Sequence, residues 1–285
     1  MFIAIDIGAT KTEIGFYRDR DLASFMSSSV LKTSQSYAKG VEAIIRIIRR
    51  TIGNIPVTGI GVSFPGVVSL DGAIVQASNI PDYAKKPLKK DLETAIRTNV
   101  FVIQDASCSA IAELLYGSIG RHHRIVYLIM GTGLGGSLIE KEAKRTIISP
   151  MEPCGMIVDA THGRFHEFNT VKGLLEAYIG GGNIEYTYKR SLKDTKDDDP
   201  LWGEVTEYLA IGINNLNCIL KPEVVIIGGG IGQKRQRALA GVTEKMKKYH
   251  EFVKPPEVQF TAVKGNSSLI GALAANFVTN LELRT

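Results

Sequence analysis

The sequence has few cysteines and no long apolar run, and both absences narrow the class of protein. Three of the 285 residues are cysteine, and they are widely separated: Cys108, Cys154 and Cys218. An odd number without C-x-x-C spacing predicts neither a disulfide framework nor a metal knuckle. Nowhere do 18 apolar residues follow one another, and no basic region precedes the first apolar run, residues 2–7. We therefore expect a cytoplasmic protein that is neither exported nor membrane-spanning.

A strong excess of one charge is also missing. The chain carries 34 Lys and Arg against 29 Asp and Glu, a net charge of +5 that is spread along the sequence. This balance is weak support for a nucleic-acid partner and suits an anionic small ligand equally well. There is no low-complexity tail and no N-terminal helix-turn-helix. With 44% hydrophobic residues the chain can bury a real core, and its length favours two lobes or one large α/β unit.

Strand and helix patterns alternate along the chain. Apolar runs predict strands at residues 2–7, 12–16, 57–64, 100–103, 125–129 and 224–227. Apolar residues with helical spacing predict helices at residues 40–50, after Asp105, at 201–220 and at 268–278. This alternation is typical of an α/β fold.

Three glycine-containing turns follow predicted strands. The first comprises Gly8, Ala9, Thr10, Lys11 and Thr12, and the second runs from Gly131 through Thr132, Gly133 and Gly135 to Gly136. The third is Gly228, Gly229 and Gly230. Backbone amides and hydroxyls in such turns can hold phosphate oxygens. The first turn does not have the spacing of a Walker A loop. Taken by itself, it is equally well interpreted as an ordinary hairpin. Together the three turns predict a nucleotide bound between two lobes.

Five landmarks occur in the order that is typical of one family. They are the turn after Asp6, the segment Gly61 to Gly66, the Asn79-Ile80-Pro81 loop, Gln104-Asp105-Ala106, and Gly131 to Gly136. On these residues the chain resembles the ROK family (repressors, open reading frames and kinases) over nearly its whole length. The resemblance implies an α/β fold of two ribonuclease-H-like lobes, as in actin-like ATPases, with the active site in the cleft between them. The expected lobes are residues 1–116 with 268–285, and residues 117–267.

The resemblance also implies roles for individual residues. Asp105 would be the catalytic base, although a helix N-cap is the plainer interpretation of its position. The sugar would be bound by Asn79, Gln104, Asp105, Glu152 and Glu176, and ATP by the three glycine turns. Asp6 would hold Mg²⁺ through water, with Lys11 as a nearby positive charge.

The chain departs from the family pattern at three positions. Gln104 replaces an asparagine, Gly155 occupies the place of a histidine, and Leu174 that of a cysteine. The family's structural zinc needs that histidine and three cysteines, but residues 159–174 contain no cysteine, so we expect no zinc. His162 and His166 are two isolated imidazoles. We expect Phe165, Phe168 and Leu174 to order this segment by packing.

The resemblance implies an ATP-dependent kinase that phosphorylates the 6-hydroxyl of a hexose or N-acetylhexosamine, and a homodimer. Glucose, N-acetylglucosamine and N-acetylmannosamine remain open as substrates. An alternative is a kinase for another small sugar, such as fructose or allose. A sugar-sensing member without catalysis would need a DNA-binding part that this sequence lacks, and a non-sugar ATPase or acetate-type kinase would leave Asn79 and the two glutamates unexplained.

Overall fold

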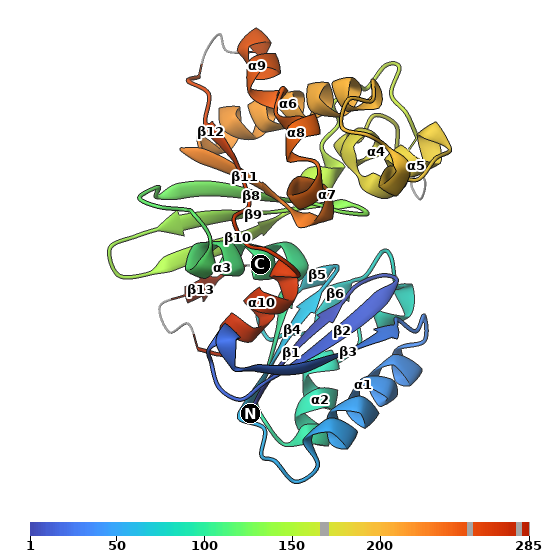
Figure 1. The fold of residues 1–285 in the computed structure, drawn as a ribbon, viewed down its shortest axis with the longest axis vertical. Coiled ribbons are helices and arrows are strands. Elements are labelled where there is room, and N and C mark those ends of the chain that lie inside the picture. Colours follow the sequence, from blue (N-terminus) through green and yellow to red (C-terminus); the bar gives the residue numbers. More distant parts are fainter. Residues whose placement is uncertain (166–170, 250–252, 278–280, 285) are drawn as a thin grey trace. The chain divides into compact units, whose positions relative to one another are not determined.

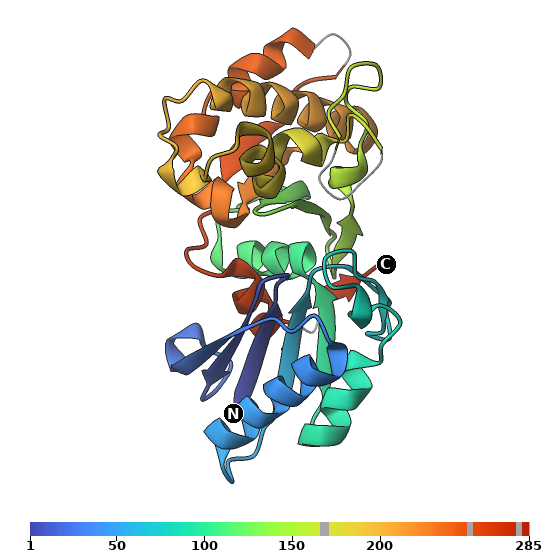
Figure 2. The ribbon, with the colours of Figure 1, turned by 90° about the vertical axis from the view of Figure 1, so that its right-hand side faces the viewer.

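In the computed structural model the chain divides into two compact units. The first unit comprises Met1–Gly117 and Gly265–Thr285, and the second unit comprises Ser118–Lys264. The structure describes residues 1–165, 171–249, 253–277 and 281–284, drawn as ribbons in Figures 1 and 2.

The first unit is built on a five-stranded sheet in the order β3-β2-β1-β4-β7. Its strands are β1 (Phe2–Ile7), β2 (Lys11–Tyr17), β3 (Phe25–Lys32), β4 (Gly59–Phe64) and β7 (Val100–Gln104). The strands β1, β4 and β7 are parallel to one another, whereas β2 is antiparallel to both β1 and β3. A separate antiparallel pair is formed by β5 (Val67–Val68) and β6 (Ile74–Gln76). The first unit therefore begins with a hairpin and continues with parallel strands.

The two faces of this sheet carry side chains of different size. One face presents isoleucine, valine and phenylalanine side chains to α1 (Tyr37–Ile52) and α2 (Leu88–Ile96), which lie together against it (Figures 1 and 2). Val41, Ile44 and Ile48 form the buried stripe of α1, as the helical spacing predicts. The 3₁₀ turns of this unit are η1 (Leu22–Ser24) and η2 (Pro81–Tyr83).

The other face is lined by small residues, which allow a helix to approach the strands closely. It is covered by α10 (Ser267–Ala274), which also packs on α3 (Asp105–Tyr116). A Cβ atom added to Gly61 of β4 would overlap the carbonyl oxygen of Ala272, and one added to Gly271 would overlap that of Cys108. The backbone of α10 is thus in direct contact with both β4 and α3. The sequence predicts this helix at residues 268–278, but it ends at Ala274, and Val278 lies outside the described residues.

The second unit repeats the strand order of the first. Its strands are β8 (Arg124–Met130), β9 (Leu134–Lys141), β10 (Thr146–Met151), β11 (Val224–Gly228) and β12 (Glu257–Phe260). In its sheet the order is β12-β11-β8-β9-β10, with β8, β11 and β12 parallel and the β8-β9-β10 meander antiparallel. Each unit therefore has a glycine turn in its leading hairpin followed by parallel strands, which is the duplicated α/β arrangement that the sequence predicts. A last strand, β13, spans Leu281–Leu283.

The second unit contains several helices. They are α4 (Leu175–Ile179), α5 (Gly181–Tyr188), α6 (Leu201–Leu220), α7 (Gly229–Lys234), α8 (Gln236–Leu239) and α9 (Val242–Met246), with 3₁₀ turns η3 (Pro153–Gly155), η4 (Leu192–Asp194) and η5 (Lys247–Tyr249). Of these helices, α4, α8 and α9 pack on α6. The bounds of α6 confirm the helix predicted at residues 201–220, and the carboxylate of Asp199 accepts a hydrogen bond from the amide of Leu201 at its start. In the part of the chain that is described, none of these helices or those of the first unit has the length and apolarity needed to cross a membrane.

The contact between α10 and α3 should be sensitive to a single methyl group. We expect Gly271→Ala to lower the free energy of unfolding by about 1–3 kcal/mol, because the added Cβ has to displace backbone. The matched control is Gly203→Ala, on an exposed position of α6 where a Cβ meets nothing within 4 Å. That substitution should leave stability unchanged or raise it by up to about 1 kcal/mol. Chemical denaturation of both variants checks this, and equal stability of the two would contradict the tight packing.

Candidate functional site

Polar residues collect at the carboxyl ends of the parallel strands in the first unit. Asp6 near the end of β1 pairs in register with Ser63 on β4, and Phe64 pairs with Gln104, the last residue of β7. Asp105 follows directly as the first residue of α3. This edge is where open α/β sheets bind their ligands. The register therefore brings together Asp6, Gln104 and Asp105, which the sequence predicts as site residues.

The carboxylate of Asp6 is half-buried and held from two sides. Its Oδ1 accepts a hydrogen bond from Ser63 Oγ at 2.8 Å, and its Oδ2 accepts one from Asn266 Nδ2 at 2.9 Å. Burial raises the pKa of Asp6, and the bonds from Asn266 and Ser63 oppose that rise. Each oxygen keeps a lone pair for water, so this donor set fits the water-mediated binding of Mg²⁺ that is expected for Asp6.

Asn266 connects two carboxylates to the start of α10. Its Nδ2 also donates to Glu13 Oε2 at 3.1 Å, while its Oδ1 accepts from the backbone amide of Leu269 as the helix N-cap. Glu13 in turn lies 3.7 Å from Lys11 Nζ. The sequence analysis missed both Asn266 and Glu13. Asparagine before two serines at a helix start was a visible capping signal, whereas nothing in the sequence distinguished Glu13.

The first glycine turn connects β1 to β2. Gly8 and Ala9 are half-buried, whereas Thr10 and Lys11 are exposed. The amide of Gly8 donates to the carbonyl of Lys11 at 2.8 Å, which closes the turn. Thr10 and Lys11 are therefore the members of this turn that are open to a ligand.

Thr33, the residue after the end of β3, supports this turn. Its amide donates to the carbonyl of Thr10 at 3.1 Å, and its hydroxyl donates to the carbonyl of Gly8 at 2.7 Å. The hydroxyl of Thr12 is buried and lies 2.9 Å from that of Thr33. Thr12, predicted as a phosphate contact, thus has its hydroxyl engaged inside the unit.

Asp105 begins α3 with its side chain at the helix N-terminus. Its Oδ1 accepts a hydrogen bond from the amide of Ala106 at 2.7 Å. Burial raises the pKa of Cys108, one turn further along α3, and the negative charges of Asp6 and Asp105 add to the effect. Both carboxylates therefore act on the same thiol, which is consistent with their position at one edge of the sheet.

The predicted sugar contacts of the first unit differ in exposure. Asn79 is exposed and precedes η2, whereas Gln104 is only 8% exposed. The Oε1 atom of Gln104 accepts a bond from Ser107 Oγ at 3.5 Å. Asn79 is thus open to a ligand, while the amide of Gln104 faces mainly protein.

The second glycine turn is fixed to the helices that follow it. Glu176 Oε2 accepts a hydrogen bond from the amide of Leu134 at 2.6 Å. The carbonyls of Gly131 and Thr132 accept from the amides of Gly181 and Gly182 at 2.9 and 2.8 Å. Of the predicted contacts in this turn, Thr132 is exposed and Gly133 and Gly135 are half-buried. Glu176 therefore belongs to the structure of the turn, a role that the sequence did not reveal.

The two glutamates that are predicted to bind the sugar, Glu152 and Glu176, lie close to Cys154. The thiol of Cys154 donates to Glu152 Oε2 at 3.4 Å. Burial raises its pKa to about 12, and the charges of Glu152 and Glu176 contribute to that rise. These two glutamates are therefore close to one thiol although 24 positions separate them in the sequence. Gly155 beside them is exposed, and a Cβ there would meet nothing within 4 Å.

Of the side chains predicted to order the segment between the two glutamates by packing, one is exposed. Phe165 is 59% exposed, with Lys172 Nζ 4.6 Å from the centre of its ring, so its predicted burial is wrong. Leu174 is buried, as expected, and Phe168 lies outside the described residues, as does His166. His162 is exposed. Within the described ranges, no three His, Cys, Asp or Glu side chains are grouped as metal ligands, and the absence of zinc stays a prediction.

The third glycine turn is the junction of β11 and α7. Gly228 ends the strand, and Gly229 adopts a φ of 76°, a left-handed conformation that favours glycine. Gly230 is exposed. The role of these three glycines in binding nucleotide stays a prediction.

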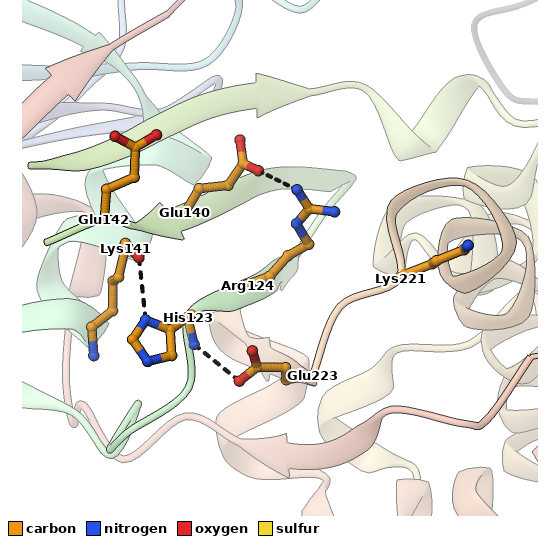
Figure 3. Close-up of a pocket in the computed structure, with 7 residues that line it drawn as sticks. All are labelled: His123, Arg124, Glu140, Lys141, Glu142, Lys221 and Glu223. Atoms are coloured by element: carbon orange, nitrogen blue, oxygen red, sulfur yellow. Dashed lines mark hydrogen bonds and ion pairs between the residues drawn. The ribbon is translucent and has the colours of Figure 1, made fainter.

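A polar hollow elsewhere in the second unit contains none of the predicted site residues (Figure 3). It is lined by His123, Arg124, Glu140, Lys141, Glu142, Lys221 and Glu223. Arg124 pairs with Glu140 at 2.7 Å, and the amide of His123 donates to Glu223 at 3.0 Å. The residues that line the hollow thus bind one another. We assign the hollow no function.

The duplicated units and their glycine turns define an α/β protein with the actin-like ATPase fold. The sequence profile of the ROK family matches residues 2–276, so the chain belongs to the ROK family. It is 27% identical over 259 residues to an N-acetyl-D-glucosamine kinase of Vibrio cholerae serotype O1, covering 81% of this chain and 84% of the relative.

Solved structures show the same fold. A ROK family glucokinase from Streptomyces griseus, in complex with glucose and AMPPNP, superposes with a TM-score of 0.78 at 21% identity, covering 96% of this chain and 98% of that one. A ROK family transcriptional regulator, a homologue of the E. coli MLC protein, gives a TM-score of 0.76 at 17% identity, covering 96% of this chain and 77% of the regulator. The fold is therefore shared by members of the family with different activities.

The burial of Cys154, together with the charges around it, predicts a thiol that reacts unusually slowly. With a pKa of about 12, its thiolate fraction at pH 8 is about 10⁻⁴, and alkylation by iodoacetamide should accelerate about ten-fold per pH unit above that. Glu152→Gln removes one neighbouring charge and should speed the reaction at pH 8. Mass spectrometry separates Cys154 from the exposed Cys218, which serves as the internal control. Equal labelling rates for the two cysteines at pH 8 would rule out the proposed environment.

Proposed function

We propose that this protein is an ATP-dependent sugar kinase that transfers the γ-phosphoryl group to the 6-hydroxyl of a hexose or an N-acetylhexosamine. The observation that carries the proposal is the position of Asp105, which follows a parallel strand and shares its edge of the sheet with Asp6. Membership of the ROK family and the likeness to an N-acetyl-D-glucosamine kinase support the same activity.

In this proposal Asp105 is the general base. A sugar hydroxyl is a weak nucleophile, so a carboxylate within hydrogen-bond reach orients it and accepts its proton as the phosphoryl group leaves ADP. The short bond from the amide of Ala106 to Asp105 Oδ1 fixes the carboxylate at the start of α3.

Nucleotide binding would use the glycine turns and Asp6. Thr10 and Lys11 in the first turn and Thr132 in the second are exposed and offer a hydroxyl, an ammonium group and backbone amides to phosphate oxygens. Asp6, held by Ser63 and Asn266, would bind Mg²⁺ through water. Bound Mg²⁺ supplies positive charge that neutralises the β- and γ-phosphate oxygens.

The sugar would be held by amide and carboxylate groups. Exposed Asn79 and Glu152 would contact its hydroxyls, and Glu176 would do so through its carboxylate. The open space at Gly155 favours a sugar with a substituent at the 2-position. We therefore include N-acetylglucosamine and N-acetylmannosamine with glucose among the proposed substrates.

Removal of the proposed base should abolish most activity without loss of binding. We expect Asp105→Asn to lower kcat by about two to four orders of magnitude, the usual contribution of a positioned general base, with sugar binding retained. A coupled ADP-release assay measures the rate, and calorimetry measures sugar binding. Asp71→Asn, an exposed aspartate of the same unit, is the matched control. More than a tenth of native activity in Asp105→Asn would refute the assignment.

The same assay separates a kinase from a sugar sensor. A sensor binds sugar but releases no ADP, and Asp105→Asn would leave its sugar affinity unchanged. Sugar-dependent ADP release by the native protein would exclude that alternative, whereas sugar binding without any ADP release would favour it.

The space at Gly155 should set the tolerance for a 2-substituent. We expect at least one N-acetylhexosamine to be phosphorylated by the native enzyme. Gly155→His should then raise the KM for that sugar more than for the plain hexose, because steric exclusion acts on the substituent alone. Gly155→Ala is the control for loss of glycine. Strict rejection of all N-acetylated sugars by the native enzyme, or an equal effect of Gly155→His on both sugars, would contradict this.

A further inference from the structure

Backbone hydrogen bonds join the two ends of the segment between Glu152 and Glu176. The amide of Leu175 donates to the carbonyl of Met156 at 2.7 Å, and the amide of Val158 donates to that of Gly173 at 2.8 Å. Further out, the amide of Gly173 donates to the carbonyl of Arg164 at 2.8 Å. These bonds pair residues 156–165 with residues 171–175. They do not attach the paired segment to the rest of the unit.

Arg164 adds a polar attachment to the apolar packing of Met156 and Val158 on the core of the unit. Its Nη2 lies 2.6 Å from both carboxylate oxygens of Glu204 on α6, and the two side chains are about one-quarter to one-third exposed. Tyr188 on α5 donates its hydroxyl to the same carboxylate. The guanidinium also lies 5.0 Å from the ring centre of Tyr178 on α4 and 5.7 Å from that of Tyr188. One side chain therefore connects the segment to α4, α5 and α6, which are neighbours in Figure 1.

Tyr178 forms a second attachment at the same place. Its hydroxyl accepts from the amide of Arg164 at 3.0 Å and donates to Asp159 Oδ2 at 3.2 Å. Its ring stacks on that of Tyr208 of α6, with ring centres 3.5 Å apart. Tyr178 lies two residues after Glu176, so the same helix, α4, carries both side chains. Partly buried ion pairs with several hydrogen bonds and cation–π contacts are worth more than exposed pairs.

We propose that Arg164 is a positioning residue that, through Glu204 and Tyr178, holds residues 156–165 and 171–175 in the arrangement in which Glu152 and Glu176 bind the sugar. This inference rests on the proposed function for its effect on sugar binding, but not for its effect on the order of the segment. The cluster of Arg164, Glu204, Tyr178 and Tyr188, which we name the Arg164 cluster, takes the place of the aromatic packing expected from the sequence.

Substitution of Arg164 should change sugar binding selectively. We expect Arg164→Ala to raise the sugar KM about ten-fold or more, because Glu152 and Glu176, once displaced, no longer bind the hydroxyls of the sugar. The ATP KM and kcat should change less than about two-fold. Arg164→Lys keeps the charge without the planar fork and should recover part of the loss. Arg124→Ala is the matched control, since it removes an arginine that pairs with a glutamate at 2.7 Å in the same unit.

Hydrogen exchange gives a readout that needs no catalysis. Backbone amides of residues 156–165 and 171–175 should exchange faster in Arg164→Ala, while those of α6 and the sheet stay protected. Glu204→Gln, which keeps the shape of the partner and removes its charge, should produce the same pattern to a smaller extent and guards against a general folding defect.

Two results would overturn the inference. One is an unchanged sugar KM in Arg164→Ala of an active enzyme, and the other is unchanged exchange of the segment. If the native protein phosphorylates no sugar, the proposed function fails, and the exchange data alone decide whether the Arg164 cluster orders the segment.

Discussion

The side-chain amide of Asn266 joins parts of the chain that are up to 260 positions apart in the sequence. Its nitrogen donates to the carboxylates of Asp6 and Glu13, and its oxygen caps α10. The negative charges of Asp6 and Glu13 repel each other, and the hydrogen-bond donor that the two carboxylates share offsets part of that repulsion. The position of Asp6, and with it the acidic edge of the first unit, therefore depends on the exact seating of α10. That seating is set by the absence of side chains at Gly61 and Gly271.

The fold could be predicted where burial leaves a periodic pattern in the sequence. β1 and α6 have such patterns, and both were expected at the residues where they occur. β3 could not be foreseen, because most of its residues are exposed and it is held by backbone pairing with β2. α4 and α5 are short and contain or adjoin glycines, so they depend on contacts with α6 and the second glycine turn rather than on local propensity.

The site was predictable where a residue type coincides with a strand end. Asp6 and Asp105 follow this rule, since parallel strands present the next residues at one edge. Glu13 and Arg164 do not, because their partners, Asn266 and Glu204, are distant in sequence and no local pattern signals a long-range hydrogen bond. Phe165 shows the converse error. Its apolar character suggested burial, but its side chain is exposed, with the ammonium group of Lys172 over its ring.

The order of the two units along the chain has a consequence for synthesis. The second unit is continuous, whereas the first is completed only by residues that follow it. At roughly 5–20 residues per second, a ribosome needs on the order of ten seconds between the last strand of the first sheet and α10. During that interval the small-residue face of β1 and β4 has no helix to cover it. A nascent chain thus leaves this face of its N-terminal part uncovered for longer than the surfaces of its middle part.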